Sequence, residues 1–111
     1  MSVLRGDVYW VDPGGALGTE QAGRRPYLVL SQRSFNDRLG AVVGIALTSR
    51  EPKWPFPLSV PVGEGRLPRR SWAKVGQVRT ISVLRLGDRL GRVAPADVDR
   101  TLEALLEIIG P

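Results

Sequence analysis

The sequence predicts a mainly β protein, in which five to seven short strands form a small, partly open β-barrel and one amphipathic helix packs on it. Two observations indicate this fold. Short apolar runs, many of them rich in β-branched residues, recur between residues 7 and 93 and are separated by glycine, proline and polar residues. After residue 94 the apolar residues change to helical spacing.

Three strands are expected in the first half of the chain. They occupy residues 7–11 (DVYWV), 27–31 (YLVLS) and 41–48 (AVVGIALT), which are short, apolar and rich in β-branched or aromatic residues. The polar residues 32–38 (QRSFNDR) lie between the last two strands and are expected to form one helical turn.

The second half contains one proline-rich strand and two longer candidates. In residues 56–62 (FPLSVPV) apolar residues alternate with prolines and a serine. Because proline cannot donate a hydrogen bond to a neighbouring strand, an edge strand is predicted there. Residues 71–81 are expected to form one long strand or a bent pair. Residues 86–93 form another, in which Gly87 and Gly91 fit a barrel corner.

A helix is predicted from Pro95 to the end of the chain. Proline suits the first helical turn, Asp97 and Asp99 suit the positive end of the helix dipole, and Gly110 suits the stop. One apolar stripe is expected on this helix, made of Val98, Leu102, Leu105, Leu106 and Ile109.

Length and composition limit the classes of function. The chain has 111 residues, 42% of them hydrophobic, so a single domain over residues 1–111 is expected. Cysteine and histidine do not occur, which excludes disulfides, thiolate metal sites and histidine-based catalysis. No apolar run approaches the roughly 20 residues that span a bilayer, and no signal peptide is recognisable. The expectation is a soluble, cytoplasmic protein.

The charge is unevenly distributed. The net charge is +5, but residues 97–111 contain four acidic residues and one arginine, so the preceding residues carry +8. Arginine pairs with phosphate through a planar fork, and a basic body therefore suggests a polyanionic partner. Composition agrees equally well with a charge that serves only solubility.

One predicted connection is unusually long. Residues 12–25 (DPGGALGTEQAGRR) join two strands where hairpin loops usually take about two to five residues. Loops of this length are commonly functional or disordered. This one contains Glu20 and ends with Arg24 and Arg25, which could form an exposed salt bridge or a reaction centre.

Few kinds of catalysis are compatible with these side chains. The eleven acidic residues are dispersed, so no metal site is expected, and the phosphate-binding loop of NTPases is missing. RNA cleavage by its own 2′-hydroxyl needs only a base and a cation that stabilises the charge on phosphorus. Glu20 and Arg25 meet that need.

Four motifs occur in order over nearly the whole chain. They are RGDVYWVD at residues 5–12, GTEQAGRRP at 18–26, LTS at 47–49 and GQVRTI at 76–81. Together they resemble the MazF/PemK family of toxin–antitoxin ribonucleases, for which the second motif is quite specific. The resemblance implies an SH3-like barrel with a C-terminal helix, shared with the CcdB gyrase poisons. It also implies a sequence-specific endoribonuclease without metal or cofactor, which leaves a 2′,3′-cyclic phosphate and a 5′-hydroxyl.

The resemblance assigns catalytic roles to three residues. The family's catalytic arginine matches Arg25, its acid in the same loop matches Glu20, and its threonine at the end of the third strand matches Thr48. A permanently charged arginine suits charge stabilisation better than proton donation, and Glu20 suits the base. Some relatives place an acid before the QxRTI segment. Here that position is Gly76, so Glu20 must take the proton or no protein group does.

Further residues are candidates for binding RNA. Trp54 and Phe56 could stack unpaired bases, or they could be core or dimer contacts. Gln77 is expected in an RNA groove with Arg79, although Arg79 could equally be a solvated strand residue. The remaining candidates are Thr19, Gln21, Arg24 and Ser49. A mobile basic loop for the phosphate backbone or an acidic partner is expected at Arg66, Arg69 and Arg70.

The resemblance also implies partners. We expect single-stranded RNA as substrate, a homodimer with an RNA groove across its interface, and an antitoxin whose acidic tail occupies that groove. Two alternatives on the same fold are a CcdB-like gyrase poison and a non-catalytic RNA-binding barrel.

Overall fold

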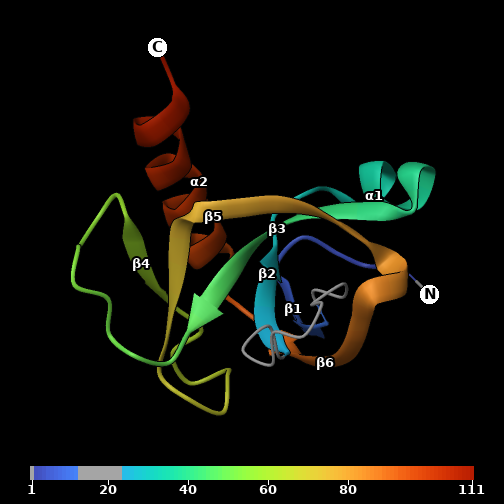
Figure 1. Cartoon of the computed structure of the whole chain (residues 1–111), viewed down its shortest axis with the longest axis horizontal. Coiled ribbons are helices and arrows are strands. Elements are labelled where there is room, and N and C mark those ends of the chain that lie inside the picture. The colour runs from blue at the N-terminus through green and yellow to red at the C-terminus, as the bar shows by residue number, and fades with distance from the viewer. Residues whose placement is uncertain (1, 13–23) are drawn as a thin grey trace, which may run out of the picture.

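Six strands form one strongly curved antiparallel sheet, with helices at its margins (Figure 1). The structure is a computed structural model that describes residues 2–12 and 24–111. The strands are β1 (Asp7–Val11), β2 (Arg25–Val29), β3 (Ala41–Thr48), β4 (Ser59–Val62), β5 (Ser71–Ser82) and β6 (Leu86–Arg92). The helices are α1 (Arg33–Leu39), the short 3₁₀ helix η2 (Val83–Arg85) and α2 (Pro95–Ile109).

The strand order in the sheet is β4-β5-β3-β2-β1-β6. The proline-containing β4 is an edge strand, as predicted, and β6 forms the other edge. The loop between β4 and β5 reaches back to β6, where a Cβ on Gly91 would come within 3.0 Å of the Arg66 carbonyl oxygen. The sheet is therefore curled like a barrel but not closed by strand pairing, which confirms the predicted mainly β, partly open fold.

The pairing of β6 with β1 is irregular beside Gly91. Val8 pairs with Gly91 and Tyr9 pairs with Arg89, so Leu90 has no partner in the register. Such an irregularity bends a strand, and a glycine at this position agrees with the predicted barrel corner.

Most predicted elements match the observed ones to within one or two residues, and β1 and β3 have the predicted bounds. The difference that matters is in β2. Residues 27–31 were expected, whereas the strand begins at Arg25 because Pro26 and Arg25 pair with Trp10 and Val11 of β1. Arg25 is therefore a strand residue and does not belong to the preceding loop.

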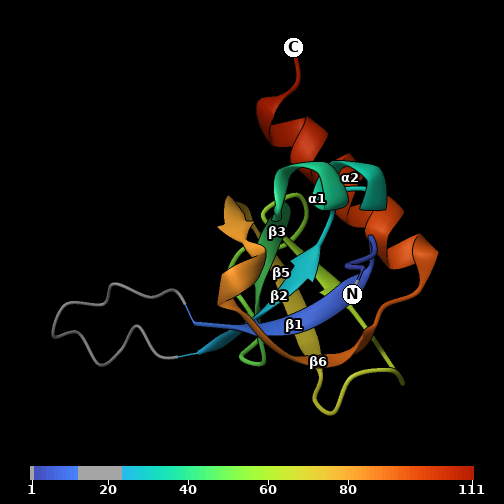
Figure 2. The ribbon, with the colours of Figure 1, turned by 90° about the vertical axis from the view of Figure 1, so that its right-hand side faces the viewer.

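Two apolar clusters lie on opposite faces of the sheet. The larger one includes Leu28, Ile45 and Val75 and is covered by α2 from Val98 to Leu105. The helix α2 also contacts β4 and β5 (Figure 2). The second is centred on Tyr9, Tyr27 and Val42, with Val3 at its margin.

The predicted stripe on α2 is only partly buried. Val98 is buried and Leu102 and Leu105 are half-buried, but Leu106 and Ile109 are 64% and 66% exposed. Only the first part of the predicted apolar stripe therefore packs on the core. The last turns of α2 project beyond the sheet (Figure 1), so no strand lies beneath them.

The alternation predicted for residues 56–62 also fails at its start. Ser59 is buried and donates a 2.7 Å hydrogen bond to the Trp54 carbonyl oxygen, whereas Leu58 is 47% exposed. The strand begins only at Ser59, and an irregular segment precedes it. Within residues 2–12 and 24–111, neither α-helix is long and apolar enough to cross a membrane.

Candidate active site

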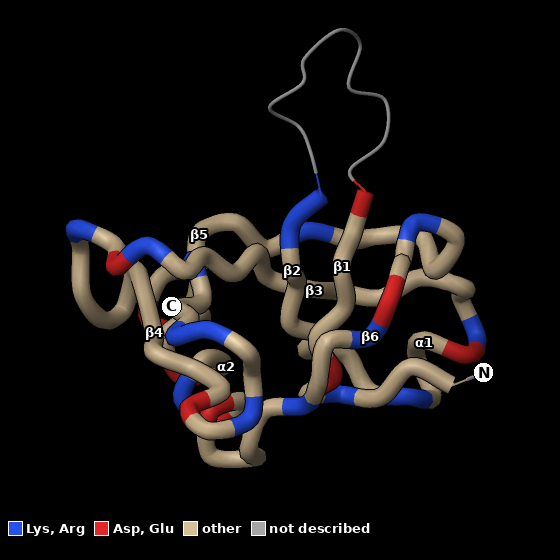
Figure 3. Tube along the Cα trace, turned by 90° about the horizontal axis from the view of Figure 1, so that it is seen from below, with Lys and Arg blue, Asp and Glu red and all other residues tan. Residues whose placement is uncertain are grey.

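A cavity of about 460 Å³ opens where β3 ends and β2 begins. Its polar lining comes from Arg25 on β2, Thr48 and Ser49 at the end of β3, and Arg69 and Ser71 around the start of β5. Its apolar lining includes Trp10, Leu67, Pro68 and Leu90. Figure 3 shows the Cα trace from below, with the start of β2 in blue. Strands from both halves of the sheet therefore meet at one polar opening with apolar walls.

The sheet register brings Arg25 and Thr48 together. In the β2–β3 pair, Tyr27 lies opposite Ala46 and Leu28 lies opposite Ile45. Extending this antiparallel register by two residues places Arg25 opposite Thr48, and directly opposed residues project from the same face of a sheet. Both residues line the cavity. The two residues that the resemblance selected from distant motifs thus line the same cavity.

The hydroxyl of Thr48 has a defined direction. Its Oγ1 accepts a 3.1 Å hydrogen bond from the backbone N–H of Arg50, and the same oxygen lies 3.5 Å from the Arg50 carbonyl oxygen. On its other side, Thr48 pairs with Trp72 of β5. A hydroxyl oriented in this way, at a cavity that Arg25 also lines, can hold a phosphate oxygen.

Arg24 faces a different environment from that of Arg25. Its guanidinium lies over the ring of Trp10, 5.1 Å from the ring centroid, and it lines a second cavity of about 340 Å³ together with Asp12 and Arg85. The two consecutive arginines therefore line different cavities.

The other predicted RNA contacts lie elsewhere. Trp54 is 60% exposed, with the Lys53 ammonium 5.6 Å from its ring centroid. Phe56 is half-buried, and the Arg100 guanidinium lies over its ring at 3.8 Å. Neither lines the Arg25 cavity, and neither do Gln77 and the exposed Arg79 of β5. A role for these four residues in binding RNA stays a prediction.

Three predicted site residues fall outside the part of the chain that the structure describes. These are Thr19, Glu20 and Gln21, and their assigned roles stay predictions. Of the remaining candidates, the structure gathers Arg25, Thr48 and Ser49 in one cavity.

The sequence analysis did not select Trp10 and Ser71 of the cavity as site residues. Trp10 lies within one of the four motifs, which was an available signal. Arg69 was recognised only as one of three loop arginines. The spacing of the three loop arginines did not indicate that, of these three, Arg69 alone lines the same cavity as Arg25.

The charged residues in the described lining of the cavity are all positive. Among the described residues that line the cavity, two are arginines and none is acidic. No group of three or more acidic residues that could hold a metal ion occurs within residues 2–12 and 24–111. The cavity presents an environment that attracts anions.

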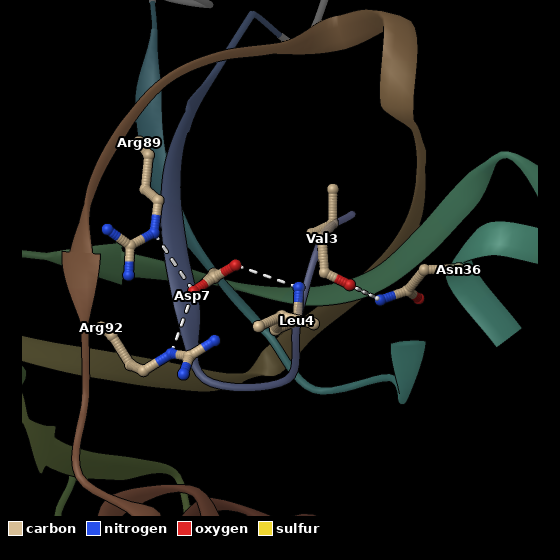
Figure 4. A network of polar contacts seen from close by, with 6 residues as sticks. All are labelled: Val3, Leu4, Asp7, Asn36, Arg89 and Arg92. Atoms are coloured by element: carbon tan, nitrogen blue, oxygen red, sulfur yellow. Dashed lines mark hydrogen bonds and ion pairs between the residues drawn. The ribbon is translucent and has the colours of Figure 1, made fainter. Parts of the chain in front are cut away.

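A buried carboxylate organises the other end of β1. Asp7 Oδ1 accepts hydrogen bonds from Nε of Arg89 at 3.2 Å and Nε of Arg92 at 3.1 Å, and Oδ2 accepts one from the Leu4 backbone N–H at 3.0 Å (Figure 4). Burial, and secondarily the Asp7 charge, raises the pKa of the neighbouring Tyr9 above 10.0, while the two arginines oppose this effect. This network holds the edge strand β6 against β1.

Comparison with known proteins gives consistent matches. The family model described as PemK-like, MazF-like toxin of type II toxin–antitoxin system matches residues 4–109. The chain is 34% identical to endoribonuclease MazF6 of Mycobacterium tuberculosis over 114 residues, which cover 97% of this chain and all of that protein. It is also 34% identical to endoribonuclease EndoA of Bacillus subtilis, with 95% and 92% of the two chains covered.

Solved structures agree with the sequence matches. One is an endoribonuclease in complex with its cognate antitoxin from Mycobacterial species, which superposes with a TM-score of 0.81 at 29% identity. The match covers 98% of this chain and 96% of that one.

Proposed function

This chain belongs to the family of PemK-like, MazF-like toxins of type II toxin–antitoxin systems, and on that premise we propose that it is a sequence-specific endoribonuclease that cuts single-stranded RNA. The observation that carries the proposal is that Arg25 and Thr48 line one cavity, with no acidic lining among the described residues. A guanidinium beside a hydroxyl is suited to a phosphodiester that gains negative charge during reaction.

The proposed reaction uses the substrate's own nucleophile. The 2′-hydroxyl loses its proton to Glu20, its oxygen attacks the adjacent phosphorus, and the bond from phosphorus to the 5′-oxygen breaks. The products are a 2′,3′-cyclic phosphate and a 5′-hydroxyl, whose proton comes from water. Arg25 stabilises the charge on the phosphoryl oxygens, and Thr48 donates a hydrogen bond to one of them. Neither step assigned to these residues requires a metal or a cofactor.

The proposed setting follows the family. Relatives have been solved with a cognate antitoxin, so we expect this chain to bind an antitoxin whose acidic segment competes with RNA for the arginines at the cavity. We also propose a cytoplasmic homodimer in which RNA crosses the interface. Light scattering at tens of micromolar should give the dimer mass, and a monomer mass would contradict this.

The central experiment is cleavage of a long single-stranded RNA by the pure protein in EDTA, followed by sequencing of the new ends. We expect cuts at one short sequence, with cyclic-phosphate and 5′-hydroxyl ends. An RNA with 2′-deoxyribose at the cut position should bind and stay intact. Binding without cleavage would favour the non-catalytic barrel, and inhibition of gyrase without RNA cleavage would favour the gyrase poison.

Substitutions test the roles proposed for Arg25, Thr48 and Glu20. Arg25→Lys keeps the charge but loses the planar fork, so it should cost about 2–4 kcal/mol of transition-state stabilisation. Thr48→Val should also slow cleavage, and Glu20→Gln should lower kcat more than it weakens binding. The matched control is Arg38→Gln, at the exposed end of α1, which should cleave at the normal rate. Normal cleavage by Arg25→Ala would show that this cavity is not the active site.

A further inference from the structure

We infer that Arg69 is a substrate-binding residue of this site, which holds the RNA phosphate next to the one that is cut. The inference rests on the proposed endoribonuclease function and adds a second phosphate contact to it. It begins from a placement in the fold: Arg69 comes from the β4–β5 loop and Arg25 from β2, yet both line the same cavity.

Arg69 is held in place by an ordered loop. Gly63, at φ +75°, accepts hydrogen bonds at its carbonyl oxygen from the N–H groups of Arg66 and Leu67, at 2.9 and 3.0 Å. Its own N–H donates to Asp97 Oδ2 at 2.7 Å. At the other end of the loop, the Ser71 hydroxyl donates to the Arg69 carbonyl oxygen at 2.9 Å. The loop expected to be mobile is thus tied to α2, to itself and to β5.

The three arginines of this loop differ in their surroundings. The Arg70 guanidinium lies over the Trp72 ring, 4.8 Å from its centroid, and Arg66 is exposed away from the cavity lining. Arg69 is the one of the three that lines the cavity. If the three arginines served only solubility, their surroundings would not need to differ in this way.

The positive charges of Arg25 and Arg69 favour the binding of two anions at this cavity. Within residues 2–12 and 24–111, no carboxylate forms a salt bridge with Arg25 or Arg69. Two arginines that line one cavity, with no acidic residue in its described lining, attract anions. Phosphates along a single RNA strand provide such anions.

The size and lining of the cavity fit a nucleotide better than a lone phosphate. A volume of about 460 Å³ lies within the range of small-molecule sites, which begins at roughly 300 Å³. The apolar wall of Trp10, Leu67 and Pro68 suits a base or ribose, and the hydroxyls of Ser49 and Ser71 suit its polar edge. With the cut phosphate at Arg25, the next phosphate reaches Arg69.

The test measures binding and turnover separately. Binding uses an RNA with 2′-deoxyribose at the cut position, titrated by fluorescence anisotropy at several salt concentrations. Arg69→Gln should raise Kd about tenfold and reduce the slope of log Kd against log salt by about 0.7, the value for one single-strand phosphate contact. With a cleavable RNA, KM should rise while kcat stays within about threefold. The matched control, Arg66→Gln, should change each quantity by less than about twofold.

A modified substrate makes the test specific. A neutral methylphosphonate at the phosphate next to the cut removes the proposed partner of Arg69. Wild type should then bind as weakly as Arg69→Gln binds normal RNA, and the substitution should have no further effect on the modified RNA. Additive losses would overturn the inference, as would equal effects of Arg69→Gln and Arg66→Gln or a loss confined to kcat. Because the anisotropy assay does not need cleavage, it reads Arg69 even if the endoribonuclease proposal fails.

Discussion

The backbone N–H of Gly63 donates a 2.7 Å hydrogen bond to the Asp97 carboxylate, and this contact joins the β4–β5 loop to the first turn of α2. The sequence predicted Asp97 only as a favourable charge at the positive end of the helix dipole. In the fold it also holds the loop that carries Arg69. The stability of the C-terminal helix and the geometry of the cavity are therefore connected through one carboxylate.

Asp97→Ala should weaken both the fold and the site. Loss of a charge-assisted hydrogen bond and of the helix-dipole interaction should lower the free energy of unfolding by about 1–2 kcal/mol. A looser loop should raise KM for RNA more than it lowers kcat. Urea unfolding and steady-state cleavage measure the two effects. The control is Asp99→Ala on the same helix, where the side chain is exposed, and equal effects of both variants would contradict the role of the loop contact.

Gly63→Ala and Gly65→Ala form a matched pair in the same loop. Both residues have positive φ, +75° and +74°, so each substitution should cost about 1–2 kcal/mol of backbone strain. A Cβ on Gly63 would also overlap the Leu67 side chain, which lines the cavity, whereas nothing lies within 4 Å of one on Gly65. Thermal unfolding should therefore show a larger loss for Gly63→Ala, and RNA binding should weaken for that variant alone. Equal RNA affinity of the two variants would refute the link from Leu67 to the site.

Asp7→Asn should destabilise the junction of β1 and β6. The substitution leaves two guanidiniums without their counter-charge, but these are 49% and 40% exposed and can be hydrated, so we expect about 2 kcal/mol. Asp37→Asn removes an exposed pair with Arg33 and should cost only a few tenths of a kcal/mol. Denaturant unfolding at pH 7 compares them. A loss as small for Asp7 as for Asp37 would show that the network in Figure 4 contributes little.

Tyr9 should make the protein sensitive to alkali. Because burial raises its pKa in the folded state above 10.0, the folded protein keeps a proton that the unfolded chain has lost, and stability falls as the pH rises above about 10. Tyr9→Phe removes this contribution. Unfolding free energies between pH 8 and 11 should show a constant difference between wild type and variant up to about pH 10. Above that pH the wild type should lose stability relative to Tyr9→Phe, and parallel curves throughout would contradict the raised pKa.

The sequence by itself determined the elements of this fold, because their signals are local. Alternating or continuous apolar residues predicted β1 and β3 to the residue, and the prolines of β4 predicted an edge strand, since a missing N–H is tolerated only there. Arg25 and Thr48 were selected by motif alone. Arg25 lies on β2 and Thr48 on β3, which are paired strands, and both residues are among those that the structure describes.

The tertiary structure decided what depends on contacts between distant segments. The pairing of β2 with β3 brought Arg25 and Thr48 to one cavity, and the return of the β4–β5 loop to Gly91 and Asp97 brought Arg69 into the same cavity. The stripe on α2 looked uniform in sequence, yet Leu106 and Ile109 are exposed because the sheet ends before the helix does. Periodicity states which face of an element is apolar, whereas only the assembled chain determines how far its neighbour extends and which loop side chains converge on a site.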